Sequence, residues 1–356
     1  MKTPFKKIFP LSLCALMVFP TLPIYGAEGS ESVTIEHAMG TTEVPYSPER
    51  VCVLDSSGMD IMVALELTDY VTCVQQPKGY ASYLADYYNS DTVIKLESTK
   101  GGGGKGRGEV DENADPYEVY YTIDADLIIG DIDTVDEDLY GLLSQIAPTI
   151  ITGYTIDNED GVYAGAVENA RMIASIWGVE EKVDAICEKY DPVYEQLGEA
   201  LNGKTGIVTT STADSNILGV AVNDGWEDDS EKLECERSVR ILYDLGMNLL
   251  SNDVPEEVAE ASVYNRQEEA DVRAEKNKVI AAWIEETNPE YLIDVDRYYT
   301  SLEEAAADGN ALTDLEDLTV TKNGNLCMLS YDGRIGSNGL YGLTIQMDEL
   351  QAFFLD

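Results

Sequence analysis

Short apolar runs alternate with helical patterns along this chain, and this alternation constrains its fold more than any other feature. Runs typical of buried strands lie at 50–55, 70–75, 92–96, 126–130 and 149–152, and again at 206–210, 217–222, 291–295 and 326–330. Strand–helix–strand units predict parallel sheets with helices on both faces. Ligands of such sheets gather at the carboxyl ends of the strands. We therefore expect an α/β fold with binding residues in the loops after the strands.

A long stretch with helical periodicity and little strand signal separates the two series of strands, at 162–201. Gly178 divides this stretch, and Pro192 should kink or restart its second part. The run Asn202-Gly203-Lys204 has the pattern of a helix end. Further helices are predicted at 238–245, 277–286 and 343–354, and a helix capped by Ser57 should follow the first strand.

Residues 1–27 have the pattern of an export signal. Three lysines lie among the first seven residues, an apolar run follows, and Gly26 and Ala27 offer small residues for cleavage. A lipid anchor on Cys14 is the alternative, but the bulky Leu13 precedes it, so we favour plain cleavage. No other stretch approaches the roughly 18 apolar residues of a membrane span. We therefore expect an exported, soluble chain.

The chain is strongly acidic. Its formal charge of -44 becomes -47 once the three lysines of the leader are removed. Such a surface repels nucleic acid and anionic lipid, so we expect no nucleic-acid partner. Solubility or adaptation to salt explains most of the acidic residues. A local cluster of Lys and Arg is more informative in such a chain, because it stands against this background.

Cysteine and histidine usage argues against a metal centre. Five of the six cysteines follow the leader, and none has CxxC spacing. Cys52 and Cys73 lie in successive predicted strands, so we expect them to be neighbours; buried free thiols are favoured, and one disulfide stays open. His37 is the only histidine and is interpreted as a structural hydrogen-bonding residue. The acidic run 131–138 lacks the spacing of a calcium loop.

Several motifs resemble one class of bacterial protein. The opening VTIEHAMGTTEVP (33–45), running into PERVCVLD (48–55), resembles the entry of ABC-importer solute-binding proteins for ferric siderophores, haem or cobalamin. Similar motifs follow in the family's order: PKGYASYL (77–84), DLII (126–129), LLSQIAPT (142–149), NPEYLIDVDR (288–297) and GLYGLTIQMDEL (339–350). No single motif is decisive, but their shared order is specific. The catecholate-siderophore binders are the nearest branch.

This resemblance implies two Rossmann-like lobes with mostly parallel sheets, a single long α-helix that joins them, and a ligand cleft between them. The division would be a signal peptide at 1–27, a first lobe at 28–161, a connecting helical segment at 162–203 and a second lobe at 204–356. The implied function is to bind a ferric siderophore outside the cytoplasmic membrane, in the periplasm or at the outer face of that membrane. The protein would deliver this ligand to the transmembrane subunits of the permease as a monomer, without a cofactor and without catalysis.

The resemblance also implies that arginines meet the anionic iron complex. Arg297 stands at the family's "DR" position, although pairing with Asp294 or Asp296 is the structural alternative. A second family arginine precedes a "YD.LG" segment. Here both Arg237 and Arg240 precede YDLG (243–246), so both are carried over.

The third arginine of the branch is missing after the DLII strand. The loop KGGGGKGRG (100–108) follows the third predicted strand and offers Lys105 and Arg107, with glycines that let backbone N–H groups turn toward an anion. A flexible surface loop is the alternative interpretation. Arg334 follows the last strand, and Tyr83 and Trp226 offer flat aromatic walls.

Other functions stay open as alternatives. Haem or cobalamin would be the next ligands within the same class. An exported hydrolase is a second class, but the chain has no GxSxG, no HExxH and no catalytic Cys–His setting. An adhesion or scaffold module is a third class, and it would not need basic loops at strand ends.

Overall fold

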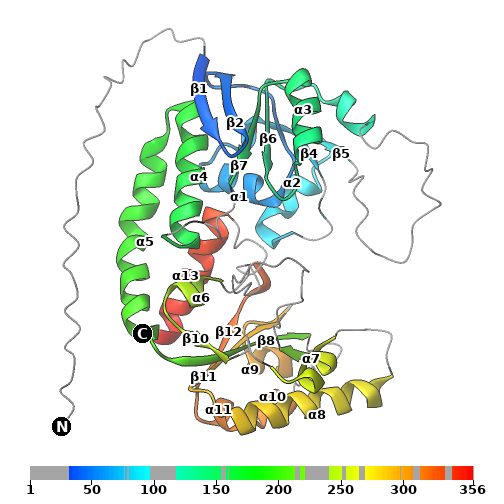
Figure 1. Cartoon of the computed structure of the whole chain (residues 1–356), viewed down its shortest axis with the longest axis vertical. Coiled ribbons are helices and arrows are strands. Elements are labelled where there is room, and N and C mark those ends of the chain that lie inside the picture. The colour runs from blue at the N-terminus through cyan, green and yellow to red at the C-terminus, as the bar shows by residue number, and fades with distance from the viewer. Residues whose placement is uncertain are drawn as a thin grey trace, which may run out of the picture. The chain divides into compact units, whose positions relative to one another are not determined.

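The computed structural model describes residues 32–75, 77, 80–96, 118–153, 158, 160–212, 217–220, 240–250, 254–263, 269–296, 298–307, 313–332 and 339–355. The chain from Ser32 to Asp356 forms one compact unit. The predicted leader lies outside the described residues. The predicted lobe boundaries stay predictions, but the α/β architecture is evident in both halves (Figure 1).

The first sheet is parallel, with the strand order β5-β4-β3-β6-β7. β4 and β5 extend it to one side of β3, and β6 and β7 extend it to the other. The strand order therefore reverses between β3 and β6, which is the kind of switch point where ligands of α/β sheets bind. The bounds are β3 (Val51–Val53), β4 (Val71–Gln75), β5 (Ile94–Leu96), β6 (Leu127–Asp131) and β7 (Thr149–Thr152).

The second sheet has the order β10-β8-β11-β12, and β9 pairs antiparallel with β8. Its strand order reverses between β8 and β11, which is the second switch point. All nine predicted strands are present, and the two-residue β10 was not predicted. The bounds are β8 (Thr205–Thr212), β9 (Ile217–Val220), β10 (Asn248–Leu249), β11 (Tyr291–Asp296) and β12 (Leu326–Leu329).

Helices connect the strands in both halves. The first half has α1 (Ser56–Ala64), η1 (Thr68–Tyr70), η2 (Ser82–Leu84), α2 (Ala85–Tyr88), η3 (Glu118–Thr122) and α3 (Glu137–Ile146). The second half has α6 (Arg240–Asp244), α7 (Glu256–Ser262), α8 (Ala270–Thr287), α9 (Leu302–Ala307), α10 (Thr313–Glu316), α11 (Thr319–Lys322) and α13 (Leu340–Phe354). α8 begins seven residues before the prediction, because its first two turns bury no side chain and give no clear apolar period.

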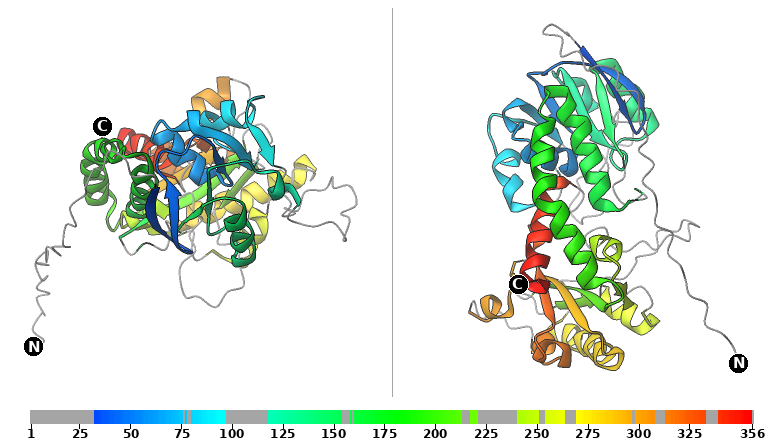
Figure 2. Two further views of the ribbon diagram at one scale, coloured as in Figure 1. Left: turned by 90° about the horizontal axis from the view of Figure 1, so that it is seen from above. Right: turned by 90° about the vertical axis from the view of Figure 1, so that its left-hand side faces the viewer.

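The connection between the halves consists of α4 (Val162–Trp177) and α5 (Glu180–Leu201). Gly178 ends α4 in the left-handed conformation, as its predicted dividing role requires. α5 continues through Pro192, so the helix does not restart there. α4, α5 and α13 pack against one another (Figure 2). The largest buried cluster also draws side chains from both sheets and these helices, so one apolar core runs through the connection.

Two local features differ from the sequence predictions. Asp55, and not Ser57, caps α1, because its side chain accepts a hydrogen bond from Gly58 N. The opening motif forms a hairpin of β1 (Ser32–His37) and β2 (Gly40–Pro45), which was not predicted. Only one side chain of each hairpin strand is buried, so the period-two signal is weak. No helix in the described ranges is long and apolar enough to cross a membrane.

A substitution at Gly130 on β6 tests the tight packing next to the first switch point. An added Cβ would lie 2.7 Å from Val135 Cγ2. We expect Gly130→Ala to lower the free energy of unfolding by about 1–3 kcal/mol, as overpacked cores do. The control is Gly141→Ala on the exposed face of α3, where nothing lies within 4 Å; it should raise stability by roughly 0.5–1 kcal/mol. Urea unfolding measures both, and equal values would contradict this packing.

Candidate functional site

A serine hydroxyl lies between two carboxyl groups at the switch point of the first sheet. Asp55 follows β3, and Asp131 ends the neighbouring β6. Ser57 Oγ lies 2.6 Å from Asp55 Oδ1 and 3.2 Å from Asp131 Oδ2. The backbone N–H of Gly58 donates to Asp55 at 2.6 Å, and that of Thr134 donates to Asp131 at 2.7 Å. Local backbone donors therefore orient both carboxyl groups at the strand ends.

The switch point of the second sheet repeats this arrangement. Ser211 on β8 pairs in register with Asp296 on β11. Ser211 Oγ lies 2.6 Å from Asp294 Oδ2 and 2.9 Å from Asp296 Oδ2. Thr209 Oγ1 donates to Asp294 Oδ1 at 2.6 Å. Two backbone amides that follow β11 donate to Asp296 Oδ1, at 2.8 and 3.1 Å.

Each pair of carboxyl groups favours holding a proton near neutral pH. A serine hydroxyl carries one hydrogen, so it donates to only one of its two carboxyl neighbours. Burial raises the pKa of Asp55 to about 8, and the charge of Asp131 acts in the same direction. Burial likewise raises the pKa of Asp294 to about 7, with a smaller contribution from Asp296. A proton on Asp55 in the first pair, or on Asp294 in the second, lets the bridging serine donate one hydrogen bond and accept the other.

Segments that follow strand ends of the two sheets touch each other. Ser82 comes after β4, and its backbone N–H donates to Asp332 Oδ1 at 2.6 Å. The Ser82 hydroxyl donates to the other oxygen of Asp332, which comes after β12. Tyr83 lies edge-on against Tyr341 in the first turn of α13, with ring centroids 4.9 Å apart. The chain after β4 therefore meets the chain that leads into α13.

Asp60 of α1 lies at this meeting point and is only 1 % exposed. Its carboxylate accepts hydrogen bonds from Tyr83 Oη at 2.6 Å, from Tyr341 N at 2.7 Å and from Gly342 N at 2.9 Å. Burial raises the pKa of Asp60 to about 7, while these three donors act in the opposite direction. Asp60 therefore connects three donors from two distant segments.

Two of the eight predicted ligand-binding residues are described, and both have protein partners. The Tyr83 hydroxyl donates to Asp60, and burial raises the pKa of Tyr83 far above its ordinary value. Arg240 Nε donates to Asp244 Oδ1 at 3.0 Å, and its guanidinium lies 4.9 Å from the centroid of the Tyr243 ring. The other six predictions lie outside the described residues: Arg297, Arg237, Lys105, Arg107, Arg334 and Trp226.

Sequence reasoning did not select Asp55, Asp60 or Asp294 as site residues. With 67 acidic residues in the chain, an acid carries little information by itself. The usable signal was position. Asp55 directly follows an apolar run, and Asp294 interrupts one. A carboxyl group in such a place needs hydrogen-bond donors when the strand is buried.

The remaining polar candidates have structural roles. His37 Nε2 lies 2.9 Å from Thr42 Oγ1, and its Nδ1 accepts a hydrogen bond from Met39 N, so it is the hydrogen-bonding residue that we predicted. Burial lowers the pKa of His37. Cys52 and Cys73 are neighbours in register on β3 and β4, as buried free thiols. Among the described residues, no group of three or more His, Cys, Asp or Glu side chains is placed to hold a metal ion.

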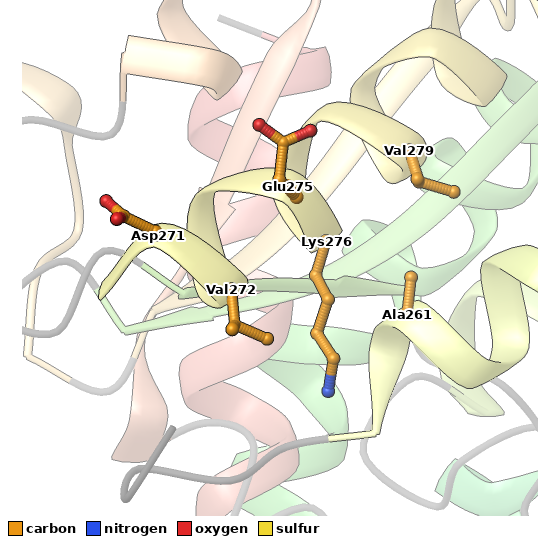
Figure 3. Close-up of a pocket in the computed structure, with 6 residues that line it drawn as sticks. All are labelled: Ala261, Asp271, Val272, Glu275, Lys276 and Val279. Atoms are coloured by element: carbon orange, nitrogen blue, oxygen red, sulfur yellow. The ribbon is translucent and has the colours of Figure 1, made fainter. Parts of the chain in front are cut away.

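An open pocket of about 420 Å³ lies apart from the strand ends, between α7 and α8 (Figure 3). Glu275 and Lys276 project in opposite directions from α8. None of the predicted ligand-binding residues belongs to its described lining, which consists of Ala261, Asp271, Val272, Glu275, Lys276 and Val279.

Comparison with known proteins identifies the fold. No family model matches the chain. A stretch of 154 residues is 27% identical to the putative ABC transporter substrate-binding lipoprotein YhfQ of Bacillus subtilis, and it covers 43% of this chain and 42% of that protein. The match therefore spans less than half of that relative.

Solved structures match over nearly the whole chain. The periplasmic catecholate-siderophore binding protein VctP of Vibrio cholerae has a TM-score of 0.60 and 20% identity, over 90% of this chain and 100% of VctP. BauB, solved with two acinetobactin molecules and ferric iron, has a TM-score of 0.61 and 19% identity, over 91% and 99% of the two chains. The petrobactin-binding protein YclQ of Bacillus subtilis has a TM-score of 0.58 and 19% identity, over 92% and 100%. The chain shares their fold, which confirms the predicted fold class.

The buried carboxyl of Asp294 predicts a specific pH dependence of stability. Its folded pKa of about 7 lies above the unfolded value of about 4, so the folded state holds more protons between these values. The free energy of unfolding should therefore fall as pH rises through this window, by up to about 1.4 kcal/mol per pH unit. Asp294→Asn imitates the neutral carboxyl and should flatten this slope.

Urea unfolding of both proteins from about pH 5 to about pH 8 measures this effect. The control is Asp91→Asn, which removes one exposed carboxylate and leaves the buried pair intact. Equal slopes for the two variants would contradict a neutral Asp294.

Proposed function

We propose that the chain is an exported solute-binding protein of an ABC importer, that its ligand is a ferric siderophore bound between the two halves, and that it catalyses no reaction. The observation that carries this proposal is the fold that it shares with VctP, BauB and YclQ over 90–92% of its length, because each of those proteins is named for a siderophore or its complex. The match to YhfQ, named as an ABC-transporter substrate-binding protein, supports the same class.

The proposed contacts are the residues predicted from the sequence. In the sequence, Arg297 directly follows Asp296, the last residue of β11, and this position after a strand is the reason for proposing it as a contact. Guanidinium groups offer forks of donors that suit the oxygen-rich surface of an anionic iron complex. Arg237 or Arg240, Lys105, Arg107 and Arg334 would add positive charge, and Tyr83 and Trp226 would add aromatic walls. Buried local charges outweigh the remote, screened charge of the acidic surface.

The proposed partners are the transmembrane subunits of a permease, to which a monomer delivers its ligand. Export follows from the leader, with cleavage near Ala27. The relative YhfQ is named a lipoprotein, so an anchor at Cys14 is the alternative to plain cleavage. Mass spectrometry of the exported protein distinguishes a chain that begins near residue 28 from one that begins with lipidated Cys14.

Titration with ligands tests both the proposed function and the proposed role of Arg297. We expect a ferric catecholate to quench tryptophan fluorescence saturably, and Arg297→Ala to raise the Kd roughly tenfold to hundredfold, as loss of a charged hydrogen bond does. Arg171→Ala is the matched control. Its guanidinium pairs with Asp184 between α4 and α5 at 2.7 Å, so ligand affinity should not change.

The same titration includes a ferric hydroxamate, haem and cobalamin. Quenching by haem or cobalamin alone would replace the siderophore with another ligand of the class. Turnover of a hydrolase substrate, or no saturable response to any of the four ligands, would contradict the binding function. Equal loss of affinity in the Arg171 and Arg297 variants would remove Arg297 from the site.

A further inference from the structure

Two long helices of this chain begin without a cap of their own. α4 and α13 both have a glycine at the N-cap position, Gly161 and Gly339, and neither glycine has a side chain to accept from the first free amides. Carboxylates from distant elements take this role. Asp60 on α1 accepts from the first turn of α13, and Asp244 Oδ2 on α6 accepts from Val162 N at the start of α4, at 2.8 Å.

The two glycines leave room for these carboxylates. A Cβ on Gly339 would overlap the Asp60 side chain, and a Cβ on Gly161 would lie 3.2 Å from Asp244 Oδ2. Gly161 also has a φ of 99°, which side-chain-bearing residues rarely adopt. The usual capping residues are therefore excluded at both helix starts, and the negative charge that the helix dipole favours comes from elsewhere in the chain.

In one contact the carboxylate comes from the first half, and in the other it comes from the second half. Asp60 belongs to α1 of the first half, and the helix it caps, α13, follows β12 of the second sheet. Asp244 belongs to α6 of the second half, and the helix it caps, α4, follows β7 of the first sheet. Each half therefore provides the carboxylate for a helix that continues from the other half.

A further side chain holds each carboxylate in place. Tyr83 Oη donates to Asp60 at 2.6 Å, and Arg240 Nε donates to Asp244 at 3.0 Å. Asp60 is 1 % exposed and the Asp244 side chain is 8 % exposed. Pulling either side chain away would leave buried hydrogen-bonding groups without partners, which is costly. Neither contact is a loose surface bond.

We infer that Asp60 and Asp244 form a reciprocal clasp that fixes the spacing of the two halves. The cap of α13 by Asp60 and the cap of α4 by Asp244 break together. The physical reason is the packing of α4, α5 and α13 against one another. When the halves separate, both caps must break, because each joins one half to the other. Simple fraying of one helix would break one cap and leave the second intact.

Hydrogen–deuterium exchange with residue resolution tests the clasp without any ligand, so its outcome is independent of the proposed function. In Asp60→Ala we expect amide exchange at Tyr341 and Gly342 to accelerate roughly tenfold, the loss expected for a cap. The deciding site is Val162 at the other end of the clasp, where exchange should accelerate as well. Asp244→Ala should produce the same pair of effects.

The matched control is Asp136→Ala. Asp136 accepts from Leu139 N at 2.9 Å at the start of α3, so its loss should leave exchange at Tyr341, Gly342 and Val162 unchanged. Asp60→Asn keeps one acceptor oxygen and the side-chain shape, and it should give smaller accelerations at the same two helix starts. Acceleration confined to the helix that each aspartate caps, in the Ala and Asn variants alike, would overturn the clasp.

Discussion

The carboxylate of Asp60 is the contact on which the arrangement of this molecule depends most. It is buried on a helix of the first half, yet two of its three donors are backbone amides in the C-terminal helix of the second half. A buried carboxylate without donors would be strongly destabilising, so the start of α13 has to remain at α1. α13 in turn packs on α4 and α5, which continues the apolar core from one half to the other.

Aspartates that accept hydrogen bonds from within the protein recur at the two switch points and at the start of α4. Asp55 and Asp131 stand at the first switch point, Asp294 and Asp296 at the second, and Asp244 at the start of α4. Each accepts hydrogen bonds from backbone amides or hydroxyl groups. The strand ends at both switch points are therefore held by polar contacts within the protein.

The sequence predicted the regular parts of the fold well, because buried strands and long amphipathic helices leave strong apolar patterns. All nine expected strands and the division at Gly178 are present. It did not reveal the β1–β2 hairpin, which buries one side chain per strand, or the start of α8, which buries none. The roles of Asp60 and Asp244 were also hidden, because they depend on contacts between residues more than 80 positions apart. Of the predicted ligand contacts, Tyr83 and Arg240 proved to hold Asp60 and Asp244.

The function proposed for this fold is to bind an iron chelate and not to transform a substrate. Native mass spectrometry of the chain mixed with equal amounts of a ferric catecholate, a ferric hydroxamate, haem and cobalamin tests it most directly, because each complex has its own mass. We expect a single adduct of one protein with one ferric siderophore complex, intact and unmodified. A spectrum with only unliganded protein, or with a chemically altered ligand, would contradict it.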